Sequence, residues 1–589
     1  MCGICGLRLF QGGKPELDQI RSMLDRLERR GPDHEGSFSD GPLAMGHRRL
    51  SILDLSFHSN QPMVDQELGL ALVFNGTIYN YLQLRRELEE LGHRFMSTGD
   101  TEVVLKAYAQ WGERCVERLT GIFAFGIWEM KTQRLMLARD RLGIKPLYYA
   151  RTHDGIRFAS NMQALLAAGG IDTSLDSVAL HHHFTLHAVV PAPRTILKGI
   201  RKLQPGHSLM IEPDGQIRLR QYWTLNAKRP EQPMSEDDWV EAIYESLSLA
   251  VKRRAEISDV PVGVLLSGGL DSSLLVGLLS EQGHRPLTFT IGFEDQPEEK
   301  GSEFEYSDAV VEQFATQHHK FHIPNEQVLS RLPEAVAQMA EPMVGQDAVA
   351  FYLLSEQVSK HVKVVQSGQG ADEVFGGYFW YPQMAAAEGD LLNRFAPYYF
   401  DRDHDEYLEM MTARYHGEDH TSAWVQQRLE DISGDTFIDK VLAFDTTTLI
   451  VDDPVKRVDN MTMAWGLEAR VPFLDHELVE RAMQVPPELK LRDGGKYLLK
   501  RIARGLLPDK VIDRPKGYFP VPALKFVRGK FLDFMRDILN SQTCRERGLY
   551  ERAYVDKLLA APDQHFTRLQ GSKLWHLALL ELWLQIHRI

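Results

Sequence analysis

The sequence predicts a protein of two domains: an α+β domain, then an α/β domain with a parallel sheet and a mainly helical C-terminal part. A chain of 589 residues is too long for one hydrophobic core. Apolar strands mix with helices in the first part, whereas strand, loop and helix alternate in the second. Between them lies a polar segment with two prolines. We therefore expect domains at 1–225 and 239–589, joined by a linker at 226–238.

The first domain combines short strands with a few helices. The spacing of apolar residues predicts a helix at 19–29, which ends where Gly31 and Pro32 follow. A charged amphipathic helix is expected at 79–91. Short apolar runs predict strands at 70–74, 123–128 and 135–138. This mixture is typical of an α+β sandwich.

The second domain alternates strands with helices. Strands are expected at 260–266, 287–291 and 362–365, and helices at 272–280 and 307–314. That alternation is typical of a parallel sheet covered by helices, whose ligands bind at the carboxyl ends of the strands. From about residue 420 the chain is mainly helical, ending in an apolar helix at 575–586.

Bulk composition limits the classes of function. The formal net charge is −14, with 43% hydrophobic and 25% charged residues. Nucleic acid and anionic membranes reward a basic surface, so we expect small-molecule partners, no nucleic acid and no membrane. No apolar run approaches the roughly 20 residues needed to cross a bilayer. Four scattered cysteines in so long a chain indicate reduced thiols, and the sequence predicts a cytoplasmic protein.

Cys2 directly follows the initiator Met1. Removal of Met1, which a side chain as small as Cys permits, would place an α-amine and a thiol on one residue. An α-amine ordinarily has a pKa of about 8 and could then accept the thiol proton. For Cys2 alone two other interpretations stay open: an ordinary buried cysteine, or a C-x-x-C pair with Cys5 that binds metal or carries out redox chemistry. A second ligand pair with suitable spacing is missing, so we interpret Cys5 as structural.

Three further segments supply what glutamine hydrolysis needs, at 47–52, 75–76 and 99–102. An arginine can hold the α-carboxylate through two hydrogen bonds, and a carboxylate can receive the α-ammonium. The Asn75 side chain and the Gly76 backbone amide can form an oxyanion hole.

With M-C-G-I-C-G at 1–6 and R-G-P-D at 30–33, these segments resemble the class II glutamine amidotransferases, which use an N-terminal nucleophile. The resemblance reaches about residue 215 and implies a four-layer Ntn-type sandwich with Cys2 as the nucleophile. It also implies Arg49 on the substrate carboxylate and Asp100 on the substrate amine. The implied glutamine site comprises Arg49, Leu50, Ile52, Asn75, Gly76, Thr77 and Asp100, with Asn75 and Gly76 as oxyanion stabilisers. The family usually reads N-G-E-I-Y-N, but Thr77 replaces the glutamate here, which predicts the loss of one polar contact to glutamine.

A glycine-rich loop joins the first strand of the second domain to its helix, in the segment V-L-L-S-G-G-L-D-S-S at 264–273. Glycine lets the backbone approach a phosphate closely, and the following helix points its amides at the same anion. A bare S-G-G can also be only a tight turn. The full segment resembles the pyrophosphate loop of ATP pyrophosphatases, an adenine nucleotide alpha hydrolase-like fold, and lacks the ending of a Walker loop. The resemblance implies cleavage of ATP between the α and β phosphates.

A second loop, S-G-Q-G-A-D-E at 367–373, follows another predicted strand. Because Mg²⁺ prefers carboxylate oxygens, we expect Asp271 and Asp372 to hold the metal. Tyr378 nearby is a candidate catalytic residue. The ATP contacts implied by the resemblance are Leu266, Ser267, Gly268, Gly269, Asp271, Ser272, Ile291, Ser367 and Gly368.

Segments 457–464, 467–475 and 496–500 extend the likeness, so that nearly the whole chain resembles the glutamine-hydrolysing asparagine synthetase family. The resemblance implies an ATP- and Mg²⁺-dependent ligase that adenylates a carboxylate and converts it to an amide with ammonia from glutamine. Lys516 matches the lysine that faces the adenylate in that family, and we count it as catalytic. The likeness further implies an interdomain ammonia tunnel and a homodimer, although the sequence leaves the oligomeric state open.

Two departures bear on the acceptor. Gln369 stands where asparagine synthetases carry an acidic residue, and Asn460 replaces the usual arginine. A glutamine can neither act as a general base nor pair with an ammonium, which disfavours a free amino acid as acceptor. These departures, with F-A-S-N at 158–161 and the histidines at 181–183, resemble the branch that amidates N-acetylglutaminylglutamine, an osmoprotectant dipeptide. We expect that acceptor first, with aspartate as the alternative.

Two other classes of function stay open. A non-catalytic sensor of glutamine or nucleotide would tolerate Thr77 and Gln369, although intact Cys2, Asp271 and Asp372 weigh against it. Transfer to a tRNA base is disfavoured because the acidic chain offers no basic RNA track.

The three histidines at 181–183 form a separate feature. On a helix they point in different directions, and no carboxylate accompanies them in the sequence. We therefore expect them at solvent or at an interface rather than around a metal.

Overall fold

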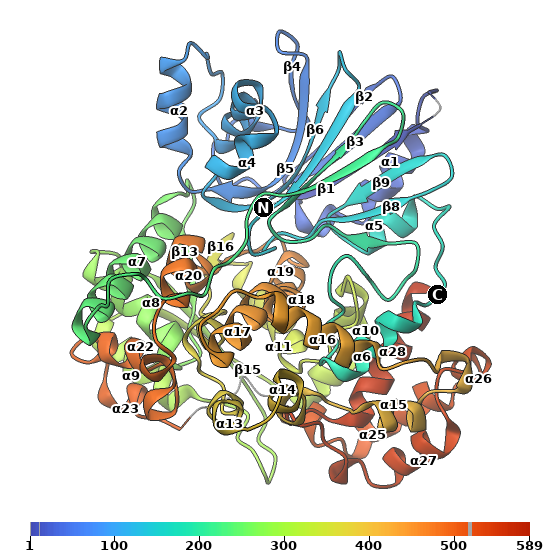
Figure 1. The fold of residues 1–589 in the computed structure, drawn as a ribbon, viewed down its shortest axis with the longest axis vertical. Coiled ribbons are helices and arrows are strands. Elements are labelled where there is room, and N and C mark those ends of the chain that lie inside the picture. The colour runs from blue at the N-terminus through green and yellow to red at the C-terminus, as the bar shows by residue number, and fades with distance from the viewer. Residues whose placement is uncertain (1, 11, 516–520) are drawn as a thin grey trace.

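The computed structural model describes residues 2–10, 12–515 and 521–589. The predicted catalytic residue Lys516 lies outside the described residues. The sheets of the N-terminal part lie at the top of Figure 1, and the helix-rich C-terminal part lies below them. Among the described residues, no helix has both the length and the apolar character to cross a membrane.

The N-terminal part contains two six-stranded antiparallel sheets. The first sheet has the order β10-β8-β9-β1-β3-β2 and comprises β1 (Gly3–Leu9), β2 (His34–Asp40), β3 (Leu43–Arg49), β8 (Tyr148–Arg151), β9 (Gly155–Ala159) and β10 (Arg201–Lys202). The second has the order β12-β11-β7-β6-β5-β4 and comprises β4 (Met63–Asp65), β5 (Leu70–Ile78), β6 (Gly121–Glu129), β7 (Arg134–Arg139), β11 (His207–Ile211) and β12 (Ile217–Gln221).

The two sheets share an apolar layer. Ile4, Val73 and Phe158 lie in it and are fully buried. A Cβ on Gly6 would come within 2.3 Å of the Phe158 ring, so glycine in β1 leaves the space that this ring fills between the sheets.

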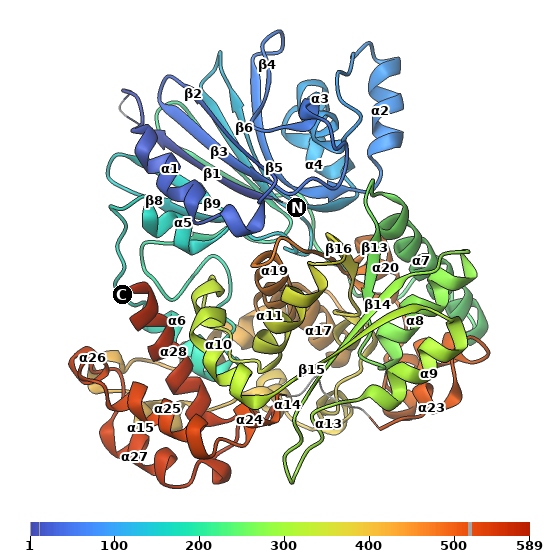
Figure 2. The same cartoon turned by 180° about the vertical axis from the view of Figure 1, so that it is seen from behind.

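Helices cover the outer faces of both sheets. Helices α1 (Leu17–Asp25) and α5 (Met162–Ala167) pack on the first sheet, and α2 (Tyr81–Glu90) and α3 (Asp100–Trp111) lie over the second (Figures 1 and 2). The predicted four-layer α+β sandwich is therefore confirmed.

The C-terminal part is built around a parallel sheet of the order β15-β14-β13-β16-β17. Its strands are β13 (Val262–Leu265), β14 (Leu287–Phe293), β15 (Gln317–Ile323), β16 (Val364–Gln366) and β17 (Glu468–Arg470). The helices around it include α7 (Glu236–Glu256), α8 (Leu270–Glu281), α9 (Phe304–Phe314) and α11 (Asp347–Val358). The predicted α/β fold is confirmed, and the sequence did not reveal the edge strands β15 and β17.

The segment that joins the two domains is shorter in the structure than the predicted linker at 226–238. Helix α7 begins at Glu236 because Ser235 and Asp238 form a reciprocal capping box. The last residues of the segment 226–238 are therefore helical.

Helix α6 (Ser177–Thr185) belongs to the N-terminal half of the sequence but packs among C-terminal helices (Figure 1). Its neighbours are α15 (His404–Met410) and α16 (His420–Asp431). Of the two surroundings expected for the three histidines in α6, solvent is wrong, because 3% or less of each is exposed; α6 instead packs at an interface with α15 and α16. The apolar end of the chain forms the buried helix α28 (Lys573–His587).

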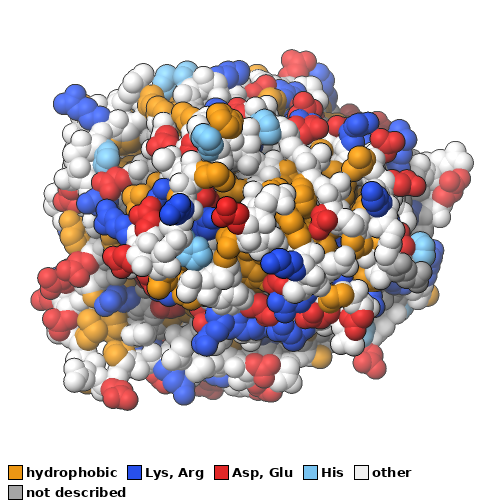
Figure 3. All heavy atoms as spheres, turned by 90° about the horizontal axis from the view of Figure 1, so that it is seen from above, with side chains coloured by type: hydrophobic (Ala, Val, Ile, Leu, Met, Phe, Trp, Pro, Cys, Tyr) orange, Lys and Arg blue, Asp and Glu red, His pale blue; other side chains and the backbone are white. Residues whose placement is uncertain are grey.

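Figure 3 looks down on the N-terminal sandwich. Acidic side chains lie among the basic ones across this face. The face therefore offers no uniformly basic surface of the kind that nucleic acid favours.

Candidate active sites

Three elements of the sandwich and one strand of the C-terminal sheet surround Cys2. A small pocket is lined by Cys2, Arg49, Leu50, Ile52, Leu53, Ser59, Gln61, Phe74, Gly76, Thr77, Asp100, Thr101 and Glu468. It forms at the end of β3, along the last residues of β5 and at the start of α3. All the residues that the sequence predicts for glutamine line this pocket except Asn75, which contacts Cys2.

The Asn75 side chain is fixed by Cys2, the predicted nucleophile. The backbone nitrogen of Cys2 donates to Asn75 Oδ1 at 2.9 Å, which turns the amide nitrogen Nδ2 the other way. Among the described residues, no hydrogen-bond acceptor contacts this buried Nδ2. A buried donor of this kind suits an oxyanion that develops beside Cys2.

Burial raises the pKa of the Cys2 thiol. The resting side chain is therefore a thiol and needs a base to become the nucleophilic thiolate. A base on the same residue, the α-amine, would meet this need.

Hydrogen bonds to neighbouring segments position Arg49 and Asp100. The Arg49 guanidinium donates to the carbonyl of Ser56 at 2.8 Å and to Asn60 Oδ1 at 2.7 Å, so its direction is set before substrate arrives. Asp100 accepts from the Ile78 amide at 2.9 Å, and burial raises its pKa to about 6.

The pocket contains a second carboxylate that the sequence did not predict. Glu468 begins β17 in the C-terminal sheet, and Thr77 Oγ1 donates to Glu468 Oε1 at 3.3 Å. Burial alone would raise the pKa of Glu468, but the Arg470 guanidinium at 2.5 Å lowers it to about 2. An ionised carboxylate therefore lies beside the position where Thr77 replaces the family glutamate.

A second cavity lies at the carboxyl ends of β13, β14 and β16. Of the predicted ATP contacts, Leu266, Ser267, Asp271, Ser272, Ile291, Ser367 and Gly368 line it, as do Asp372 and Tyr378. Gly269 lines an adjoining cavity of roughly 650 Å³, which also contains the basic side chains of Lys496, Lys500, Arg501, Arg504 and Arg514. The two cavities suit a nucleotide and its phosphates respectively.

Gly268 supports this loop from behind. Its φ is +78°, and a Cβ there would lie 2.6 Å from the backbone nitrogen of Ser307. The loop can therefore turn and lie against the start of α9 only with glycine at this position.

Asp271 and Asp372 face one point. The Lys496 ammonium lies 2.6 Å from Asp271 Oδ2 and 2.9 Å from Asp372 Oδ2. Two carboxylates that converge on one cation fit a divalent metal such as Mg²⁺. The sequence placed Lys496 in a motif without predicting this role, because the three residues come together only in the folded chain.

A third cavity, of roughly 190 Å³, adjoins the nucleotide cavity at Glu373 and Tyr378, which line both. Tyr378 Oη donates to Glu373 Oε1 at 2.8 Å, and burial raises the pKa of Glu373 to about 7. Aromatic side chains form part of the wall, including Trp380, whose ring stacks on Tyr378. We call this the acceptor cavity.

The two residues that departed from the family pattern have different positions. Gln369 lines the nucleotide cavity. Asn460 is buried on the helix α19 (Pro454–Met463) and accepts from the Ala340 amide at 2.8 Å. Asn460 therefore supports the packing of α19 and gives no direct evidence about the acceptor.

A glutaminase-type pocket in one domain and a cavity suited to a nucleotide at the parallel sheet of the other define a glutamine-dependent carbon–nitrogen ligase. Family models agree with this class: the glutamine amidotransferase domain matches residues 1–223, and asparagine synthase matches residues 242–585. The chain belongs to the glutamine-hydrolysing asparagine synthetase family.

Three relatives illustrate the family. Asparagine synthetase [glutamine-hydrolyzing] 1 of Bacillus subtilis is 32% identical over 628 residues, covering 100% of this chain and 97% of the relative. A putative asparagine synthetase of Mycobacterium bovis is 32% identical, covering 99% and 97%. Amidase chry2 of Gibberella zeae is 27% identical, covering 89% of each chain.

Proposed function

We propose that this ligase uses ATP and glutamine to amidate N-acetylglutaminylglutamine, with AMP, pyrophosphate and glutamate as the other products. Glutamine forms a thioester on Cys2 in the first pocket, and ammonia is released. The acceptor carboxylate is adenylated where the nucleotide and acceptor cavities meet. Asp271 and Asp372 would hold the Mg²⁺ that neutralises the departing pyrophosphate.

One observation carries the choice of acceptor: the carboxylates that line the acceptor cavity are paired with cationic or hydroxyl side chains of the protein. Asp347 and Asp453 both contact the Arg457 guanidinium, at 3.1 and 2.6 Å. Glu299 pairs with Lys525 at 3.2 Å.

The two remaining lining carboxylates have hydroxyl donors. Asp445 accepts from Tyr381 Oη, and burial raises its pKa well above the usual range. Glu373 accepts from Tyr378. Each carboxylate that the structure describes in this wall thus has a partner, which disfavours a free α-ammonium and suits an acceptor whose amine is acylated.

Aspartate is the second candidate. The Arg457 guanidinium lines the cavity and could face a side-chain carboxylate, and curated relatives are named asparagine synthetases. The amidase name of another relative shows that similar chains are not all named for aspartate.

Pyrophosphate release distinguishes these acceptors. The full chain is incubated with ATP, Mg²⁺ and glutamine, together with aspartate, N-acetylaspartate or N-acetylglutaminylglutamine. Release with the dipeptide alone is expected. Release with aspartate alone would make the chain an asparagine synthetase, and no release with any acceptor would contradict adenylation of these carboxylates.

A further inference from the structure

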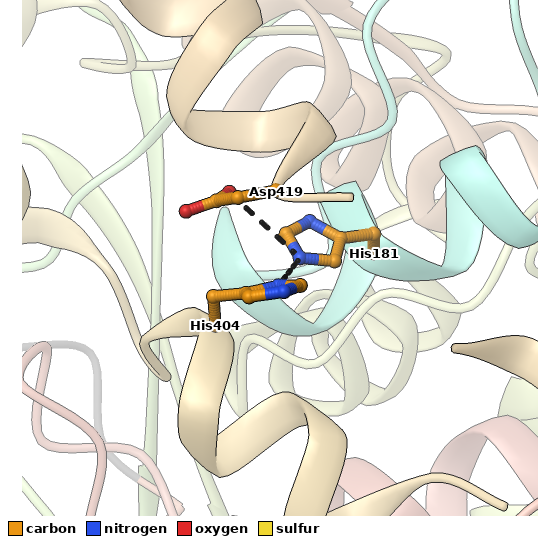
Figure 4. Close-up of side chains that lie close together, drawn as sticks. All are labelled: His181, His404 and Asp419. Carbon is orange, nitrogen blue, oxygen red and sulfur yellow. Dashed lines mark hydrogen bonds and ion pairs between the residues drawn. The ribbon is translucent and has the colours of Figure 1, made fainter. Parts of the chain in front are cut away.

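Two histidines and an aspartate from three separate helices lie close together where α6 meets α15 and α16 (Figure 4). His181 lies in α6, His404 begins α15, and Asp419 is the N-cap of α16. His181 Nε2 lies 2.9 Å from His404 Nδ1 and 3.8 Å from Asp419 Oδ1. The sequence shows no such group, because His181 is more than 200 positions from His404 and Asp419 along the chain.

The tautomer of His181 depends on the hydrogen bond that its second ring nitrogen, Nδ1, makes with Thr421. Thr421 Oγ1 lies 2.5 Å from His181 Nδ1 and 3.0 Å from His182 Nδ1. A hydroxyl has one proton, so it donates to one of these rings and accepts from the other. If His181 Nδ1–H donates to Thr421, the lone pair of His181 lies on Nε2 and faces the other two residues.

We infer that His181, His404 and Asp419 form a zinc site that ties α6 to α15 and α16. Zinc bonds to nitrogen and oxygen are about 2.0–2.2 Å, so two ligand atoms in a tetrahedral site lie roughly 3.3 Å apart. The observed separations of 2.9 and 3.8 Å lie on either side of that value. All three ligand atoms lie within 4.8 Å of one another, so small rotations of these side chains bring them around one ion.

The surroundings supply the remaining requirements. His404 and Asp419 are partly exposed, which leaves a route for the ion and for a water as fourth ligand. The carboxylate supplies negative charge and retains a second oxygen, although Oδ1 also caps α16 through the Ser422 amide at 3.0 Å. Thr421 holds the imidazole of His181 from behind, as hydrogen-bond partners commonly do for ligating histidines.

Another group of similar composition does not meet these conditions. His187, Asp401 and His576 also lie close together, but the Arg402 guanidinium is 3.5 Å from His576 Nδ1. A fixed positive charge at this distance repels a metal ion.

The zinc site would also affect the acceptor cavity. Helix α6 leads directly to His187, which lines that cavity. An ion that fixes α6 against α15 and α16 thus fixes one wall of the cavity.

Zinc binding by the full chain tests the inference. The purified protein is stripped with a chelator, and Zn²⁺ is titrated by competition with a chromophoric chelator while thermal unfolding is followed in parallel. We expect one Zn²⁺ per chain in addition to any Mg²⁺, and a higher unfolding temperature with Zn²⁺ present. Asp419→Asn keeps a good helix cap but loses the anionic ligand, and His404→Gln loses the imidazole; each should weaken zinc binding at least about tenfold.

His182→Asn is the matched control, because His182 shares Thr421 but does not face the ion. It should bind Zn²⁺ within about threefold of the parent chain. Absence of saturable Zn²⁺ binding, or equal affinity in the parent chain and both ligand variants, would overturn the site. A folded Asp419→Asn protein whose unfolding temperature still rises normally with Zn²⁺ would also overturn it.

Discussion

Single side chains around Cys2 determine the hydrogen-bond donors and the charge of the pocket. Asn75 Oδ1 holds the backbone nitrogen of Cys2, and the orientation of its amide follows from this one hydrogen bond. Glu468 adds an ionised carboxylate next to Thr77, although it comes from the other domain. The glutamine pocket is therefore completed by a residue that also belongs to the ligase domain.

Replacing Cys2 by alanine should abolish glutamine-driven amide formation and leave synthesis from added ammonium salts. Only the first reaction needs a thiolate. Both rates are measured as amide product by chromatography. Cys5→Ala is the control and should keep both activities, since the buried Cys5 thiol donates to the Gly46 carbonyl, at 3.7 Å, and does not line the pocket around Cys2. Loss of both activities in Cys2→Ala would contradict this division of labour.

Glu468→Gln should raise KM for glutamine. A hydrogen bond to a charged group contributes about 1.5–3 kcal/mol, so roughly a tenfold or larger increase is expected. KM is measured in a glutaminase assay, and ammonium-driven synthesis serves as the control for folding. An unchanged KM for glutamine would show that the ammonium of the substrate does not depend on this carboxylate.

The pKa of Glu373, raised to about 7, predicts a pH dependence. Below that pH the carboxyl is protonated and cannot accept the proton that ammonia loses when it attacks the adenylate. Glutamine-driven synthesis should therefore rise with pH through about 7. The inflection should be absent in Glu373→Gln, and its persistence there would assign the titration to another group.

At the scale of elements, the phosphate loop depends on how strand β13 meets helix α8. Gly268 has a left-handed φ and lies against the backbone of residue 307. Both its backbone conformation and this close contact require a residue without a side chain. The predicted strand and helix on either side are confirmed, because the apolar runs that form them and the glycines between them are local signals. The close approach to α9 is not local, and only the structure shows it.

Gly268→Ala should lower kcat/KM for ATP on the order of 100-fold, because the displaced loop misplaces the phosphates. Gly283→Ala is a matched control: its φ is +83°, but a Cβ there meets no atom within 4 Å. It carries the same backbone strain and should leave kcat/KM for ATP within about threefold. Both variants are compared by pyrophosphate release, and equal losses in the two would attribute the effect to strain alone.

At the scale of the whole molecule, buried charges hold the two domains together. Asp459 in α19 contacts the Arg30 guanidinium at 2.9 Å and the Lys145 ammonium at 3.1 Å, and Arg30 in turn donates to the carbonyl of Cys2. Burial alone would raise the pKa of Asp459, but these two cations lower it. Cys2 and the ligase domain are thus connected through Arg30 and the Asp459 carboxylate.

Asp459→Asn should destabilise the protein by about 3–5 kcal/mol, because Arg30 and Lys145 lose their buried counter-charge. Denaturant unfolding measures the loss. Lys363→Ala breaks an exposed pair across the same interface, with Asp33 at 2.7 Å, and should cost no more than about 1 kcal/mol. The destabilisation by Asp459→Asn should fade as pH falls through the folded pKa of Asp459, since the parent chain then loses the same charge. Similar losses for both variants at pH 7 would show that burial of the Asp459 pair contributes little.

The sequence by itself determined both fold classes, and most of the residues that it predicts for glutamine and nucleotide line cavities in the structure. Cys2, Asn75 and Asp100 lie in short motifs, and Ser267 and Asp271 follow directly after an apolar strand. Signals of this kind depend on neighbours a few residues away, so they can be read without coordinates. The predicted identity of the acceptor stays a prediction, since the sequence motifs concern the adenylation step and not the side chains that line the acceptor cavity.

The tertiary structure alone decided which distant groups meet. Glu468 lies 391 positions from Thr77, and Lys496 reaches Asp271 across 225 positions. The histidines of α6 gained a carboxylate neighbour only because α6 packs among C-terminal helices. A sequence pattern records only the spacing of residues along one element. These contacts depend on how the buried surfaces of distant elements pack, so a residue of one domain can complete a site in the other.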